Sequence, residues 1–228
     1  MVGIVIQLLL TFFILKYVAQ QDIEALGLKP TKQRVVQLLI GCCWPIIYYC
    51  LFEFSVAGLV QNPYHLNPQY SLGNFKTIVC YLLRSVVYEE LIFRAALLYI
   101  LVKKIGASKA ILISAVAFGV YHWFAWQAFG NPGRMLTVFL TTGSAGYLFA
   151  MAFVRSRSMY LPIGLHFGCN FATIIIFSKD KTVGLQWLVK SFPNDPVVPG
   201  VVVSLIVILI HFVGFQIMTY LWLRRVHY

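Results

Sequence analysis

Apolar runs about as long as a bilayer is thick follow one another along almost the whole chain, and they constrain the fold more than any other feature. A transmembrane helix needs about 20 consecutive apolar residues. Short polar or basic segments separate the runs, which span residues 2–18, 35–60, 75–102, 110–129, 135–154, 160–177 and 200–223. The pattern predicts an all-α fold, a polytopic transmembrane bundle of seven to eight membrane helices.

The composition leaves little room for a soluble domain. Apolar residues make up 60% of the 228 residues and charged residues only 11%, whereas a soluble domain carries about 25% charged residues. We therefore expect one membrane-embedded domain over residues 1–228. The net charge of +11 does not indicate a nucleic-acid partner, because the basic residues lie in short loops between the runs, as membrane topology requires.

The basic residues also predict an orientation. Loops on one side of the predicted bundle carry 11 Lys and Arg residues, and loops on the other side carry 5. Since cytoplasmic loops are enriched in Lys and Arg, the N-terminus should lie outside and the C-terminus in the cytoplasm. The apolar N-terminus has no preceding basic residue and no small-residue cleavage site, so it predicts a retained span.

Two segments leave the number of helices open. The run 75–102 is counted above as one tilted span. It is also long enough for an interfacial helix that leads into a shorter span. The polar segment 178–199 is expected to carry a short interfacial helix around residues 185–192. The chain shows no internal repeat, so a transporter built from duplicated halves gains no support.

Charged residues interrupt the run 75–102 at its centre. Glu89, Glu90 and Arg94 lie among apolar neighbours, and each charge at mid-bilayer depth costs at least about 2.5–3.5 kcal/mol. Such residues are tolerated when they face a protein interior and satisfy one another. The stretch predicts a central polar cavity and a functional site.

Further polar residues recur inside the runs at helical spacing. Residues four positions apart share a helix face, and Glu89 is rotated by about 100° from Glu90 on the same helix. If three helices pack around one cavity, both interior histidines can meet Glu89. The pairs four positions apart are Glu90 with Arg94, Phe118 with His122, and His166 with Asn170.

This set of residues suits the hydrolysis of an amide bond. A buried carboxylate can act as general base on a water molecule, and a histidine beside it can share the proton. A second histidine with an asparagine can donate to the developing oxyanion, worth about 10²–10³ in rate per donor. Arg94 would hold Glu90 and leave Glu89 free to react.

Other interpretations of the same residues stay open. Glu90 and Arg94 could form a purely structural pair, either histidine could be an ordinary interior residue, and Phe118 could be plain core. Two His and one or two Glu are also a legitimate zinc ligand set. The HExxH motif is absent, however, and no two histidines share a helix turn. We therefore expect no metal and no other cofactor, with a zinc-dependent variant as the alternative.

Three ordered motifs in separate runs, EExxxR at 89–94, FxxxH at 118–122 and HxxxN at 166–170, resemble the signature of the CPBP family. That family comprises the type II CAAX prenyl endopeptidases and the bacterial bacteriocin-processing and immunity proteins formerly called Abi. The resemblance implies an intramembrane endopeptidase of the glutamate type with about eight membrane helices. The roles it implies are a water-activating base at Glu89 assisted by His122, an oxyanion site at His166 and Asn170, and support from Glu90, Arg94 and Phe118.

The resemblance also implies a class of partner. Family substrates include proteins with a prenylated C-terminal cysteine, whereas bacterial members mostly act on other membrane-bound peptides. We expect a membrane-bound protein or peptide, including lipidated ones, and the bilayer of a prokaryotic cell as partners. A non-catalytic protein that binds a membrane peptide, such as a bacteriocin immunity protein, is the alternative; a transporter with a proton relay is disfavoured by the small size and lack of repeats.

Overall fold

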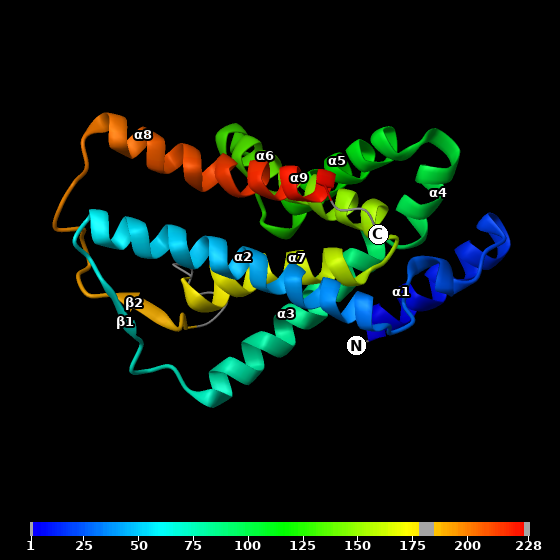
Figure 1. The fold of residues 1–228 in the computed structure, drawn as a ribbon, viewed down its shortest axis with the longest axis horizontal. Coiled ribbons are helices and arrows are strands. Elements are labelled where there is room, and N and C mark those ends of the chain that lie inside the picture. Colours follow the sequence, from blue (N-terminus) through cyan, green and yellow to red (C-terminus); the bar gives the residue numbers. More distant parts are fainter. Residues whose placement is uncertain (1, 178–184, 226–228) are drawn as a thin grey trace.

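The structure is a computed structural model that describes residues 2–177 and 185–225. It is an all-α bundle with one two-stranded sheet at one end (Figure 1). The regular elements are α1 (Val2–Phe13), α2 (Lys32–Leu59), β1 (Tyr64–Leu66), α3 (Leu72–Phe93), α4 (Ala96–Ile105), α5 (Ala107–Ala125), α6 (Pro132–Ser156), α7 (Tyr160–Asn170), β2 (Leu188–Lys190), α8 (Val201–Leu209) and α9 (Phe215–Arg225).

Three of the helical rods contain a π-helical stretch. Ile14–Ala19 continues α1, Phe171–Ile176 continues α7, and Ile210–Gly214 joins α8 to α9. Such stretches are rare in helices and often mark functional regions. The one after α7 begins directly behind Asn170.

The part of the chain that the structure describes holds five helical rods long and apolar enough to cross a membrane. They are Val2–Ala19, Lys32–Leu59, Ala107–Ala125, Pro132–Ser156 and Val201–Arg225. The rod Tyr160–Ile176 is also apolar but shorter. The chain is therefore a multi-pass membrane protein, and the all-α prediction is confirmed. α3 falls outside this set because it carries Lys76, Arg84, Glu89 and Glu90.

The run 75–102 is not a single span, so counting it as one helix is wrong. α3 ends at Phe93, and Ala95, with ψ −118°, turns the chain into α4. The Phe93 carbonyl oxygen accepts a hydrogen bond from the Ser114 hydroxyl of α5 at 3.2 Å, so this carbonyl is satisfied outside its own helix. The break adds one helical rod to the seven expected runs.

The interfacial helix expected around residues 185–192 is also wrong. Residues 188–190 form β2, which pairs antiparallel with β1 in the register Tyr64↔Lys190, His65↔Val189 and Leu66↔Leu188. Short apolar runs do not distinguish helix from strand by periodicity alone, and here pairing with a distant segment decides. β1 likewise forms a short strand within the polar segment between the runs 35–60 and 75–102.

Glycines bring α2 and α7 into direct backbone contact. Gly164 and Gly168 form a GxxxG pair on α7, a pattern that lets membrane helices approach closely. A Cβ atom on Gly164 would collide with the Leu38 carbonyl oxygen, and one on Gly168 with the Cys42 carbonyl oxygen. His166 lies between these glycines in sequence, so this contact fixes the height of His166 in the bundle.

We expect Gly168→Ala to lower the free energy of unfolding by about 1–3 kcal/mol, the usual cost of overpacking. The added methyl group would meet backbone atoms of Cys42, which cannot rotate away. Gly58→Ala on α2 is the matched control, because a Cβ there meets nothing within 4 Å. Thermal unfolding in detergent measures both variants, and equal melting temperatures for the two would contradict the prediction.

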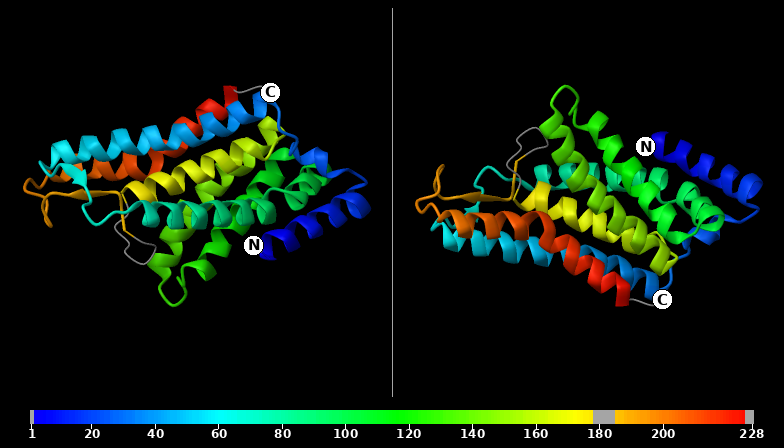
Figure 2. Two further views of the ribbon diagram at one scale, coloured as in Figure 1. Left: turned by 90° about the horizontal axis from the view of Figure 1, so that it is seen from below. Right: turned by 90° about the horizontal axis from the view of Figure 1, so that it is seen from above.

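The chain segments rich in Lys and Arg gather at one end of the bundle. The segment 26–28 receives hydrogen bonds from residues 158–160, and residues of the α4–α5 and α6–α7 connections and of the α9 end line one cavity. The small sheet and the start of α8 lie at the opposite end (Figures 1 and 2). The loops that the sequence analysis assigns to one side thus lie together in space.

Candidate active site

Three helices bring the candidate site together. Glu89 and Glu90 lie in the last turns of α3, His122 near the end of α5, and His166 in α7. All four are buried, as is Arg94 directly after α3. The structure therefore places six of the seven residues singled out by the sequence in one cluster, Phe118 included.

The Glu89 carboxylate faces both imidazole rings without touching them. Its Oε2 atom lies 3.8 Å from His122 Nε2 and 3.8 Å from His166 Nε2. Its other oxygen, Oε1, accepts a hydrogen bond from Ser85 Oγ at 3.0 Å. Oε2 is buried and has no hydrogen-bond partner among the described residues. Because 3.8 Å exceeds direct hydrogen-bond distance, the three atoms are spaced for one bridging molecule.

The other nitrogen of each ring fixes how that ring is oriented. His122 Nδ1 lies 2.8 Å from the Phe118 carbonyl oxygen, and His166 Nδ1 lies 2.8 Å from Glu90 Oε1. Since both partners only accept, each Nδ1 carries the proton and donates. In a neutral ring, Nε2 then presents a lone pair towards Glu89.

Glu90 and Arg94 form a fully buried ion pair. Arg94 Nη1 lies 3.2 Å from Glu90 Oε1, and Nη2 donates to the Gly146 carbonyl oxygen at 3.1 Å. The guanidinium also lies 4.2 Å from the ring centroid of Phe118, a cation–π contact. Glu90 Oε1 thus links Arg94 to His166, and Phe118 supports the arginine.

Aromatic rings enclose the two histidines. Phe149 of α6 stacks on His166 with centroids 4.7 Å apart and planes 17° apart. Trp126 meets the His122 ring edge-on at 5.3 Å. This apolar wall holds both rings in place and strengthens electrostatic interactions inside the site by keeping water out.

The sequence reasoning missed Ser85, Gly146 and Phe149. Ser85 precedes Glu89 by four residues, one helical turn, so its position on the same face was a usable signal. Gly146 contributes only a carbonyl oxygen, and Phe149 only a ring. In the sequence, nothing distinguishes this glycine and this phenylalanine from residues that only pack membrane helices together.

Asn170 is the one expected site residue that the structure leaves outside the cluster of contacts. It ends α7, one turn after His166, and is half-buried. Its side chain takes part in none of the hydrogen bonds found among the described residues. The amide is therefore available to a bound molecule.

Glu53, an acidic residue without an obvious partner in the sequence, does not join the site. Its Oε2 accepts a hydrogen bond from the Tyr64 hydroxyl at 2.8 Å. Burial raises the pKa of the Tyr64 phenol, and this bond with Glu53 raises it further. Glu53 therefore links α2 to the small sheet.

The positions of these side chains also show which atoms would have to bind a metal ion. In residues 2–177 and 185–225, no group of three or more His, Cys, Asp or Glu side chains is placed to hold a metal ion. The zinc-dependent alternative would have to use Glu89 Oε2 and the Nε2 atoms of His122 and His166, the three atoms that face one another.

Comparison with known proteins shows a similarity over the segment that carries the site. Residues 71–172 match the family described as Type II CAAX prenyl endopeptidase Rce1-like. Neither the curated proteins nor the solved structures give a match. The matched segment is somewhat less than half of the chain, but it runs from the start of α3 to just beyond Asn170 and so contains every candidate site residue. Over these residues the chain is similar to the Rce1-like type II CAAX prenyl endopeptidases.

Proposed function

We propose that this protein is an intramembrane endopeptidase in which Glu89 activates a water molecule. The observation that carries the proposal is the position of Glu89 Oε2, a buried carboxylate oxygen 3.8 Å from two imidazole nitrogens. A general base has to lie within hydrogen-bond reach of the proton it takes, and a link between atoms 3.8 Å apart needs a bridging molecule such as water. The similarity of residues 71–172 to a peptidase family supports the reaction class.

We infer how the two imidazoles and the water share their protons from the hydrogen-bond partners of each ring. A water has two hydrogens, so it can donate to only two of the three atoms around it. His166 contacts the Glu90 carboxylate, which stabilises an imidazolium, whereas His122 contacts a neutral carbonyl. The water then donates to Glu89 Oε2 and to His122 Nε2 and accepts from His166 Nε2. As the water attacks, Glu89 takes its proton, and His166 stabilises the developing negative charge.

Asn170 is proposed as the second oxyanion donor. We expect Asn170→Ala to lower kcat by about 10²–10³-fold, the effect of removing one such donor, with little change in KM. Thr173→Ala, in the π-helical stretch that follows, is the matched control, because Thr173 Oγ1 donates only to the Cys169 carbonyl oxygen. Peptide cleavage rates of the two variants test this prediction. An unchanged kcat for Asn170→Ala would show that Asn170 is not an oxyanion donor.

Ser85 is proposed as a positioning residue for Glu89. Ser85→Ala removes a hydrogen bond to a charged group, worth about 1.5–3 kcal/mol, so we expect kcat to fall by about 10–100-fold. Ser85→Thr keeps the hydroxyl and should recover most of the rate. A loss in Ser85→Thr equal to that in Ser85→Ala would indicate that packing, and not the hydrogen bond, matters here.

The site lies within the helical bundle, which limits the substrate. The scissile bond has to enter between membrane helices, so a membrane-associated protein or peptide is favoured. We propose a CAAX-type substrate or a bacterial membrane peptide, processed in a prokaryotic cell membrane. The basic end of the bundle would face the cytoplasm, since basic loops stay there.

A peptide panel tests this function. Purified protein in lipid nanodiscs is incubated with peptides ending in a farnesylated cysteine motif and with their unmodified twins, and products are identified by mass spectrometry. A single turnover in ¹⁸O-labelled water should place the label in the new carboxyl group, since water attacks directly. Label found in Glu89 would contradict that mechanism. Binding without cleavage of any peptide would favour the non-catalytic, immunity-type alternative.

A further inference from the structure

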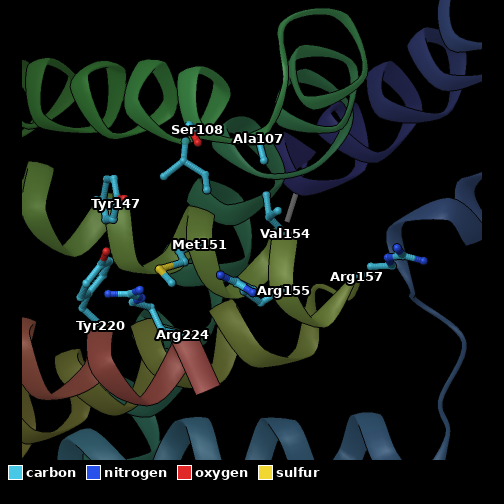
Figure 3. Close-up of a pocket in the computed structure, with 10 residues that line it drawn as sticks. Ala107, Ser108, Tyr147, Met151, Val154, Arg155, Arg157, Tyr220 and Arg224 are labelled. Carbon is cyan, nitrogen blue, oxygen red and sulfur yellow. The ribbon is translucent and has the colours of Figure 1, made fainter. Parts of the chain in front are cut away.

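A cavity lies at the basic end of the bundle, away from the proposed active site. It has a volume of about 610 Å³ and is lined by residues of α5, α6 and α9 and of the turn after α6. Figure 3 shows Arg155 and Arg224 close to Tyr147, Met151 and Tyr220, with Arg157 at the margin. Ser108 precedes His122 by 14 residues on α5, about 21 Å along the helix, so the two sites are separate.

The cavity is strongly cationic. Arg155, Arg157 and Arg224 all line it, and none of them takes part in the ion pairs found among the described residues. Arg224 lies over the Tyr220 ring, 5.7 Å from its centroid. Arginine presents a planar fork of donors that matches phosphate. Two such cations in one hollow, with a third at its margin, therefore indicate an anionic ligand.

The start of α5 adds a second anion-binding element. Ala107 and Ser108, the first residues of α5, line the same cavity. Gly106 at the helix cap offers no side chain to the free backbone N–H groups there. A helix N-terminus has free N–H donors and a positive partial charge, both of which favour phosphate.

The cavity lies where three apolar rods end. Ala107 begins one candidate membrane rod, Ser156 ends another and Arg225 ends a third. Phosphates of lipid headgroups lie at this boundary, next to the hydrocarbon. Leu112 on α5 and Leu221 on α9 are 58% and 47% exposed, so apolar surface for acyl chains adjoins the cavity. The apolar surface would not strengthen the binding of a soluble anion.

We propose that this cavity binds the phosphate headgroup of an anionic phospholipid. The arginines and the α5 N-terminus hold the phosphate, and the lipid tails lie along the exposed faces of α5 and α9. Basic pockets between helices at the cytoplasmic side of membrane proteins bind such headgroups. The competing explanation is that Arg155 and Arg224 only complement the negative ends of α6 and α9.

Native mass spectrometry of the purified full chain in detergent tests the proposal with phosphatidylglycerol and phosphatidylcholine as probes. We expect one tightly retained phosphatidylglycerol per chain. Arg155→Gln/Arg224→Gln should weaken its binding about 10- to 30-fold, because each cation contributes about three- to fivefold. Lys29→Gln/Lys104→Gln is the matched control: it removes two exposed cations from the same end and should leave binding unchanged.

Three outcomes would overturn the proposal. Equal retention of both lipids would show that the headgroup charge is not recognised. Equal loss in the two double variants would show that only net charge matters. Inorganic phosphate displacing the lipid at millimolar concentration, or raising the melting temperature as much as the lipid does, would show that a soluble anion is the ligand. Correct folding of each variant is checked by its elution volume on size-exclusion chromatography.

Discussion

Glu89→Gln is expected to lower kcat by about 10²–10⁴-fold, the range typical of removing a general base. Glutamine has the same shape and can still accept the hydrogen bond from Ser85, so the site should keep its form. The amide cannot take a proton from water, however, so attack on the peptide bond slows. Peptide cleavage in nanodiscs measures the loss, and KM should change little because substrate contacts are unaltered.

Glu53→Gln is the matched control for this experiment. It makes the same chemical change in a glutamate that contacts Tyr64 and not the histidines, so it should retain the wild-type rate. Full cleavage by Glu89→Gln would refute the assignment of Glu89 as base. Loss of wild-type activity with a chelator, restored by added zinc, would instead support the zinc-dependent alternative.

Arg94→Met is expected to lower the free energy of unfolding by about 3–5 kcal/mol, the cost of breaking a buried ion pair. Arg94 and Glu90 are both fully buried, and methionine leaves the Glu90 charge with only His166 as a partner. Methionine also removes the hydrogen bond to Gly146 and the contact with Phe118. Unfolding in mixed micelles with increasing sodium dodecyl sulfate measures the change.

The double variant Glu90→Gln/Arg94→Met separates stability from activity. Because it leaves no unpaired charge, it should recover most of the stability lost in Arg94→Met. It should stay poorly active, since His166 Nδ1 would no longer donate to a carboxylate and the imidazolium would lose its support. A double variant that is stable and fully active would show that the pair is purely structural.

The sequence predicts the spans better than the places where helices break. Length and hydropathy fix where a rod can cross the membrane, and the apolar runs correspond to helices in the structure. Nothing local marks the break at Ala95, because its neighbours are good helix formers. The break depends on burial of Arg94 and on a hydrogen bond from Ser114 on another helix, and a local pattern does not contain such contacts.

For the candidate site, spacing along one helix was predictable and contact between helices was not. The i, i+4 pairs follow from helix geometry alone. The bond between His166 and Glu90, residues 76 positions apart, follows from how α3 packs against α7. That packing depends in turn on the glycines that set α7 against α2. From the sequence, His166 is therefore assigned to the oxyanion site, but its contact with the Glu90 carboxylate is not predicted.

The glycine contact between α2 and α7 limits where a polypeptide can approach the proposed active site. Main chain lies against main chain along this seam, so the two rods behave as one stiff wall that carries His166. Main chain also approaches main chain between α5 and α6, where a Cβ atom on Gly143 would lie 3.6 Å from the Ala115 carbonyl oxygen. Since peptide groups cannot swing aside as side chains can, an incoming polypeptide is expected to enter at neither of these two seams.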